Sequence, residues 1–163
     1  MPTFEVARSM ILASVSPLGV ERVDLLSALG RVVAEDVAAP WDMPFCDNSA
    51  MDGFAVRADD CRVGGSLRVT GYIPAGGTVT PAIEPGCAVR IMTGAPVPPG
   101  CDAVVPVEET EERDDAILLR ERVKRPQHIR FRGEDVRSGD TVVSAGAVIL
   151  TVTATGDPTT LPL

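Results

Sequence analysis

The spacing of apolar and polar residues divides the chain into regions of different character. After Thr3, apolar residues recur at helical spacing, which predicts an amphipathic helix capped by Thr3 and ending near residues 16–19. A second, short helix is predicted over residues 25–29, with Asp24 as its cap and Gly30 as its stop. The N-terminal region is therefore predicted to be partly helical.

Residues 44–134 change to short apolar runs separated by glycine, proline and polar turns. This pattern predicts strands over residues 53–56, 66–73, 87–92, 103–107 and 117–122. We interpret the acidic stretch 108–115 as the solvated tip of a hairpin. Further on, residues 145–150 form an apolar segment that is predicted to pair with the opening segment.

These patterns together predict an α+β fold with a strong β share, which scarce aromatics (4%), 15 glycines and 14 prolines also favour. We expect a small, discontinuous α+β domain made of residues 1–43 plus 136–150. A β-rich domain, residues 44–135, is expected to be inserted in it. Residues 151–163, rich in threonine and proline, are expected to form an irregular tail.

The charge of the chain limits its partners. A net charge of −8 at pH 7 and a pI near 4.6 disfavour binding to nucleic acid or to an anionic membrane surface, because both need a positive face. An anionic substrate would have to be held by local donors. The candidate donors are Arg57, Arg90, Arg130 and Arg132.

Four well-separated cysteines and one histidine give no zinc-ligand spacing, which favours reduced thiols in a cytoplasmic protein. The first residues do not resemble a secretory signal, and no apolar run is long enough to span a bilayer. We therefore expect a cytoplasmic location. The chain also shows no dinucleotide-binding, P-loop or serine-hydrolase motif, which disfavours those three chemistries.

Polar residues are concentrated between positions 45 and 57. Asp47, Asn48 and Ser49 can bond to neighbouring backbone, and Asp52-Gly53 is a dipeptide typical of hairpin turns. We predict that Asp52 lies at a strand entrance with an accessible carboxylate. This group of oxygens suits a hard cation such as Mg²⁺. The alternative is that Asp52 serves only the turn.

A second polar turn follows the predicted strand that contains Arg90. Thr93 is predicted to end that strand, and Gly94 to turn the backbone so that its amides can hold an oxoanion. The alternative is a threonine that satisfies its own turn. In residues 130–135, two arginines precede Glu134 and Asp135, which is compatible with an internal ion-pair network or with an anion site whose acidic rim Asp135 completes.

Several ordered motifs carry a family resemblance. They are Leu-Gly-Arg-Val-Val-Ala-Glu-Asp-Val at 29–37, Asp-Asn-Ser-Ala-Met-Asp-Gly-Phe-Ala-Val-Arg at 47–57, Arg-Ile-Met-Thr-Gly-Ala-Pro-Val-Pro at 90–98, Asp-Ala-Val-Val at 102–105, and residues 130–135. Up to about residue 150, the chain resembles the N-terminal half of the molybdopterin molybdenumtransferase family, which includes MoeA and the C-terminal domain of gephyrin.

The resemblance implies insertion of molybdate into adenylylated molybdopterin, with release of AMP and assistance from Mg²⁺. It also implies elongated homodimers with active sites between subunits. On this basis Asp52, Thr93 and Asp135 are the predicted catalytic residues. Ser49, Gly94 and Arg90 are the predicted substrate-binding residues, and no metal ligand is assigned.

Family members continue into a large α/β domain and a small β domain, and this sequence departs from them after residue 150. We therefore expect the chain alone to be inactive. A frameshifted or truncated reading frame and a naturally short protein both remain open. The alternative function is a non-catalytic dimerisation, scaffold or partner-binding module that associates with a separate α/β partner.

Overall fold

The computed structural model describes residues 1–16, 18–78 and 82–152, so most of the predicted tail lies outside the described residues. The chain forms two units, residues 1–37 with 143–163 and residues 38–142. The fold is mixed and strand-rich, with one α-helix among the described residues. None of the helices described could cross a bilayer, which takes about 20 apolar residues.

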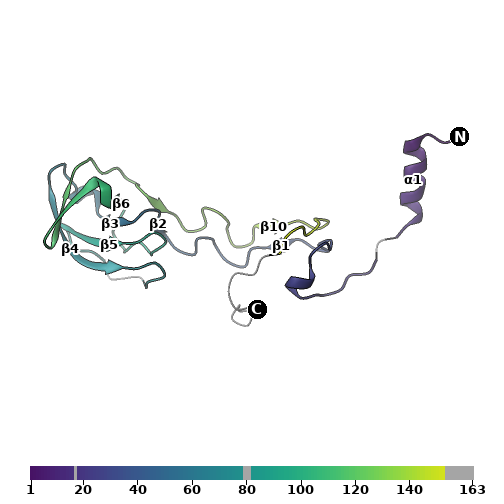
Figure 1. Cartoon of the computed structure of the whole chain (residues 1–163), viewed down its shortest axis with the longest axis horizontal. Helices are drawn as coiled ribbons and strands as arrows, with labels where there is room; N and C mark the ends of the chain where they lie inside the picture. The colour runs from purple at the N-terminus through teal and green to yellow at the C-terminus, as the bar shows by residue number, and fades with distance from the viewer. Residues whose placement is uncertain (17, 79–81, 153–163) are drawn as a thin grey trace. The chain divides into compact units, whose positions relative to one another are not determined.

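The first unit begins with α1 (Phe4–Ser14), drawn in purple in Figure 1. The hydroxyl of Thr3 accepts a hydrogen bond from Val6 N at 3.4 Å, which confirms the predicted cap. The short helix η1 (Leu25–Ser27) also forms, with Asp24 at its N-cap position as predicted, but the Asp24 side chain makes no capping hydrogen bond.

The apolar return near the end of the described chain is confirmed. Gly30 N donates to Ile149 O at 2.8 Å, and Val33 N donates to Ala147 O at 2.8 Å. Strands β1 (Val37–Ala38) and β10 (Thr141–Val143) pair with each other in a two-stranded sheet. Hydrogen bonds along the backbone therefore bring distant parts of the sequence together.

The second unit is built on a six-stranded sheet in the order β6-β3-β5-β4-β8-β7. Its strands are β3 (Gly53–Val56), β4 (Ser66–Ile73), β5 (Cys87–Ile91), β6 (Ala103–Pro106), β7 (Thr110–Arg113) and β8 (Ala116–Leu119). All five predicted strands are present, with ends displaced by three residues at most. A separate pair joins β2 (Asn48–Ser49) to β9 (Ile129–Arg130).

The acidic stretch 108–115 is mostly not a hairpin tip, which corrects the prediction. It runs through the short helix η3 (Val107–Glu109) and the edge strand β7, and the turn to β8 occupies only Asp114 and Asp115. Charged side chains are common on edge strands, where they discourage pairing with another chain. A polar composition alone therefore did not exclude a strand here.

Both faces of the central strands are covered: every residue of β3 and β6 is buried, and so is every residue of β5 except Arg90. Alternate residues of these strands pack into two separate clusters, one around Phe54 and Val105 and the other around Ala55 and Ile91. Figure 1 shows β3, β4, β5 and β6 gathered in this unit. One more short helix, η2 (Ala58–Asp60), follows β3 directly.

Gly53 lies in a strand and not in the hairpin turn that the Asp52-Gly53 dipeptide predicted. It lies within β3, is not among the glycines with positive φ, and does not form a hairpin turn with Asp52. A Cβ atom at this position would lie 2.1 Å from Val105 O of the neighbouring strand. Glycine is therefore required here by close backbone approach.

Candidate functional site

Asp52 and Thr93 meet at one end of the sheet. Asp52 directly precedes β3 and Thr93 closely follows β5, and these strands are antiparallel, with Gly53 opposite Ile91. Asp52 Oδ1 accepts hydrogen bonds from both the backbone N and the hydroxyl of Thr93, each at 2.7 Å. The strand register thus brings together two residues that lie 41 positions apart in the sequence.

These bonds stabilise the charged form of the Asp52 carboxylate. The hydroxyl and the amide of Thr93 lower the pKa of Asp52 below its ordinary value, and the positive charge of Arg90 adds to this effect. Both Asp52 and Thr93 are exposed. The pair therefore presents an ionised carboxylate to solvent at neutral pH.

The amides of the Thr93 turn are already occupied, which corrects the expectation that they hold an oxoanion. Thr93 N donates to Asp52, Gly94 N donates to Ser49 O at 2.8 Å, and Ala95 N donates to Met92 O at 2.9 Å. Gly94 does make the predicted turn, with φ of +80°. The Asp52–Thr93 pair therefore offers acceptor oxygens to a ligand, and not N–H donors.

Ser49 and Arg90, two predicted substrate-binding residues, are engaged within the chain. Ser49 is 1% exposed, and its hydroxyl donates to Met51 O at 2.5 Å. Arg90 is paired with Glu112 of β7 at 2.7 Å, and its guanidinium lies 5.6 Å from the centre of the Phe54 ring. These positions favour structural roles for both side chains.

Asp135 lies in a separate ionic group. Arg130 donates from Nε to Glu134 at 2.8 Å and from a terminal guanidinium nitrogen to Asp135 at 2.5 Å. Glu134 also accepts from Phe131 N at 2.8 Å, and these contacts lower the pKa of Glu134, Arg130 being the largest cause. The internal ion-pair network is therefore present, and no hydrogen bond between Asp135 and Asp52 occurs in the described parts of the chain.

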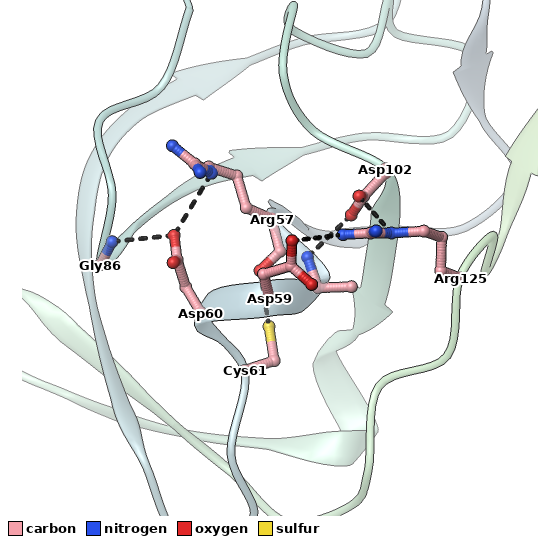
Figure 2. Close-up of polar contacts among 8 residues, drawn as sticks. Arg57, Asp59, Asp60, Cys61, Gly86, Asp102 and Arg125 are labelled. Atoms are coloured by element: carbon pink, nitrogen blue, oxygen red, sulfur yellow. Dashed lines mark hydrogen bonds and ion pairs between the residues drawn. The ribbon is translucent and has the colours of Figure 1, made fainter.

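The structure contains a second ionic network, which the sequence did not predict. Arg125 Nε lies 2.6 Å from Asp102 Oδ2, and another guanidinium nitrogen lies 3.0 Å from Asp59 Oδ2 (Figure 2). Asp102 Oδ1 also accepts from Ala58 N at 2.7 Å. Three segments far apart in the sequence are thereby joined, and no local spacing could have revealed this.

The small number of ligand side chains near Asp52 and Thr93 limits the kind of metal site they can form. Within the described residues, no group of three or more His, Cys, Asp and Glu side chains is arranged to hold a metal ion. Mg²⁺ commonly binds one or two carboxylates, together with water and substrate phosphate. Asp52, with Thr93 beside it, fits that requirement as a single protein ligand, whereas a cage made only of protein atoms does not fit.

Comparison with known proteins places this geometry in a family. Residues 2–154 match the family described as the MoeA N-terminal region, domains I and II. The chain belongs to the MoeA N-terminal family. The resemblance drawn from the motifs is thereby confirmed.

Curated relatives in this family carry the name of an enzyme. The chain is 41% identical over 165 residues to the molybdopterin molybdenumtransferase of Haemophilus influenzae, covering 100% of this chain and 39% of that protein. It is 40% identical to the protein of the same name from Synechococcus elongatus, covering 88% of this chain and 38% of that protein. The chain thus spans about two fifths of the length of these relatives.

A solved structure of the family agrees with the fold. The molybdopterin biosynthesis MoeA protein of Pyrococcus horikoshii OT3 superposes with a TM-score of 0.72 at 35% identity, covering 77% of this chain and 34% of that one. Because the identity exceeds one third and the TM-score is well above 0.5, sequence and fold point to the same family.

Proposed function

We propose that this MoeA-family chain forms part of a molybdopterin molybdenumtransferase, in which molybdate is inserted into adenylylated molybdopterin and AMP is released. The names of its relatives support the reaction, and the Asp52–Thr93 pair carries the proposal for this chain. The two hydrogen bonds to one carboxylate oxygen fix the orientation of Asp52 and keep it ionised. The proposal includes a cytoplasmic location.

In this proposal Asp52 acts through its second carboxylate oxygen. Among the described residues both hydrogen bonds reach Oδ1, so Oδ2 can accept from a water molecule or bind a cation. Mg²⁺, when bound, would supply positive charge beside the phosphate of the substrate. Thr93 holds Asp52 in place, and its hydroxyl oxygen keeps acceptor capacity.

Asp135 is proposed as a further acidic group of the same reaction. Its carboxylate is exposed and paired with Arg130. The register of β2 and β9 connects the two acidic regions, since Asn48 lies opposite Arg130 and Ser49 bonds to the Thr93 turn through Gly94. Arg130 is thus placed to compete with a ligand for Asp135, and the ion pair would have to open.

The domain arrangement belongs to the same proposal. We infer a β-rich domain inserted into a discontinuous α+β domain, and the two units, residues 38–142 and residues 1–37 with 143–163, support this arrangement. The predicted boundaries at residues 43/44 and 135/136 stay a prediction.

The 163 residues alone are not expected to catalyse the reaction. Catalysis requires the substrate to be held against the reacting groups. Because this chain spans 38–39% of the length of its relatives, most of that binding surface is expected from elsewhere. A clear turnover by the isolated chain would contradict this view.

A chimera tests the function directly. This chain replaces the corresponding part of the Haemophilus influenzae relative, and molybdate-dependent insertion is measured. The chimera is expected to be active, and Asp52→Asn is expected to lower its rate on the order of 10²-fold or more. Asp114→Asn, in the β7–β8 turn, is the matched control because it removes the same charge and should leave the rate unchanged. Equal rates for the two variants would refute the role of Asp52.

A second candidate, association with another chain, is favoured by α1. None of its residues is buried, and its large apolar side chains Phe4, Met10, Ile11 and Leu12 are exposed. We propose that this helix contributes to a homodimer, with a separate α/β partner as the other possibility. Light scattering should give a dimer that Ile11→Glu dissociates. A monomeric parent chain would contradict the proposed homodimer.

A further inference from the structure

Glu112 contacts a residue that is not its neighbour in the six-stranded sheet. It lies on the edge strand β7, and two strands, β4 and β8, separate it from Arg90 on β5. Adjacent strands lie about 4.8 Å apart, so a contact over three such spacings requires a curved sheet. Arg90 and Glu112 are nevertheless paired at 2.7 Å. The sheet therefore curls so that β7 returns over the face that carries Arg90.

The side chain of Glu112 lies on the inner face of β7. Ile117, directly opposite Glu112 on β8, is 0% exposed and belongs to the buried cluster around Phe54. Residues directly opposite each other in an antiparallel pair share a face, and successive residues of a strand alternate. Glu111 thus lies on the outer face, where it pairs with Arg113 at 2.8 Å. Two neighbouring glutamates of one strand therefore have different surroundings.

Arg90 lies over Phe54 and within reach of two carboxylates. Its guanidinium is 5.6 Å from the centre of the Phe54 ring, directly opposite on β3, and donates to Glu112. Asp52, two positions before Phe54, is a diagonal neighbour that a long side chain can reach. Among the described residues Arg90 forms an ion pair with Glu112 and none with Asp52. Its charge still lowers the pKa of Asp52, after the larger effects of two hydrogen bonds from Thr93.

We propose that Glu112 is a positioning residue, which keeps the guanidinium of Arg90 away from Oδ2 of Asp52. The inference rests on the proposed function, in which Oδ2 receives a water molecule or a cation. An arginine that binds a carboxylate occupies its acceptor oxygens, often through two hydrogen bonds. Held by Glu112 and by the face of the Phe54 ring, Arg90 supplies positive charge near the site without occupying that oxygen.

The ion pair that holds Arg90 is weak enough to be exchanged for another. The side chains of Arg90 and Glu112 are 38% and 51% exposed. Water screens an ion pair at such a surface, and pairs of this kind shift an equilibrium by about fivefold at most. Asp52 is exposed as well, so without Glu112 it is available to Arg90 as a partner. Loss of Glu112 should therefore cause a modest, measurable loss of function.

NMR of the guanidinium group in the 163-residue chain tests which carboxylate holds Arg90. Asp52→Asn should hardly move the Nε–Hε signal of Arg90 in the parent chain, because Glu112 holds the guanidinium. In the Glu112→Gln background the same substitution should move that signal clearly, because Asp52 has become the partner. Glu111→Gln, on the other face of β7, is the matched control and should leave the parent behaviour unchanged. Equal responses to Asp52→Asn in the parent and in Glu112→Gln would overturn the inference.

The rate of molybdate insertion in the chimera tests the consequence for the site. Glu112→Gln should lower the rate about three- to fivefold, because Arg90 then occupies Asp52 for most of the time. Adding Arg90→Gln should restore most of that loss, since no guanidinium remains to cover Asp52. A role of Glu112 in stability alone predicts the opposite, a double variant no faster than the single one. Glu111→Gln is again the control and should keep the parent rate.

The two experiments separate this inference from the proposed function. An inactive chimera, together with the expected NMR response, contradicts the proposed function and leaves Glu112 as the residue that holds Arg90 off Asp52. An active chimera whose rate Glu112→Gln does not change contradicts only the positioning role. A double variant as slow as Glu112→Gln contradicts it as well.

Discussion

The two units of the chain use apolar residues in different ways. In residues 38–142 the central strands bury both faces, and Phe54, Ile91 and Ile117 are at most 1% exposed. In residues 1–16, 18–37 and 143–152, the one buried side chain is that of Ala28. Local pattern therefore formed secondary structure in both units, but only the second unit encloses a hydrophobic core. The large apolar side chains of α1 in the first unit are exposed.

The largest expected effect breaks the second unit alone. Gly53→Ala places a Cβ atom 2.1 Å from Val105 O, which requires the central strands to separate. We expect a loss of at least about 4 kcal/mol in the free energy of unfolding of this unit, as for the severest substitutions. Chemical denaturation measures it. Gly71→Ala, where a Cβ would meet nothing within 4 Å, is the control and should change stability little.

The same change, leucine to alanine, made once in each unit tests the comparison between them. Leu119→Ala removes a side chain that is 2% exposed and should cost about 3 kcal/mol in unfolding free energy. Leu12→Ala removes one that is 59% exposed and should change stability by less than about 0.5 kcal/mol. Both are measured by urea denaturation of dilute chain. Similar losses would show that the apolar face of α1 is already covered.

A smaller effect concerns α1 itself. Thr3→Ala removes the side-chain acceptor of Val6 N and should cost about 1 kcal/mol of helix stability. Circular dichroism should show reduced helix content, while the unfolding of residues 38–142 is unchanged. Thr3→Ser keeps the hydroxyl and is the matched control. If Thr3→Ala also lowered the stability of residues 38–142, the two units would be coupled.

The smallest effect is the charge state of Asp52. Because Thr93 lowers its pKa below 3.8, Asp52 contributes stability above the unfolded pKa and loses it as the pH falls through the folded pKa. Thr93→Val removes the hydroxyl donor and should raise the pKa of Asp52 toward 3.8, as followed by NMR of the carboxylate carbon. Thr93→Ser should leave it low. A pKa unmoved by Thr93→Val would contradict the bond seen here.

The sequence predicted local structure better than contacts between segments. Residues 53–56 and 66–73 were identified as strands with their observed ends, because each is a short apolar run bounded by turn residues. The strand order was not predicted, since it depends on long-range pairing. Gly53 was interpreted as a turn residue because its close contact with Val105 is visible only once β3 and β6 are paired.

The candidate site shows the same limit. Asp52 and Thr93 were both predicted as site residues, but the occupation of the amides in the Thr93 turn was not, because Gly94 bonds to Ser49, which comes from another strand. The pairing of Arg125 with Asp59 and Asp102 joins distant positions and has no local signal. Residue types indicated which groups could react, and the fold decided which of them are already bonded.

The central claim, that Thr93 holds Asp52 as an oriented, ionised acceptor, is tested most directly by the rate of molybdate insertion in the chimera carrying Thr93→Val or Thr93→Ser. The account predicts a loss on the order of tenfold or more for Thr93→Val and a nearly normal rate for Thr93→Ser, because only serine keeps the hydroxyl donor. Equal, nearly normal rates for both variants would contradict it.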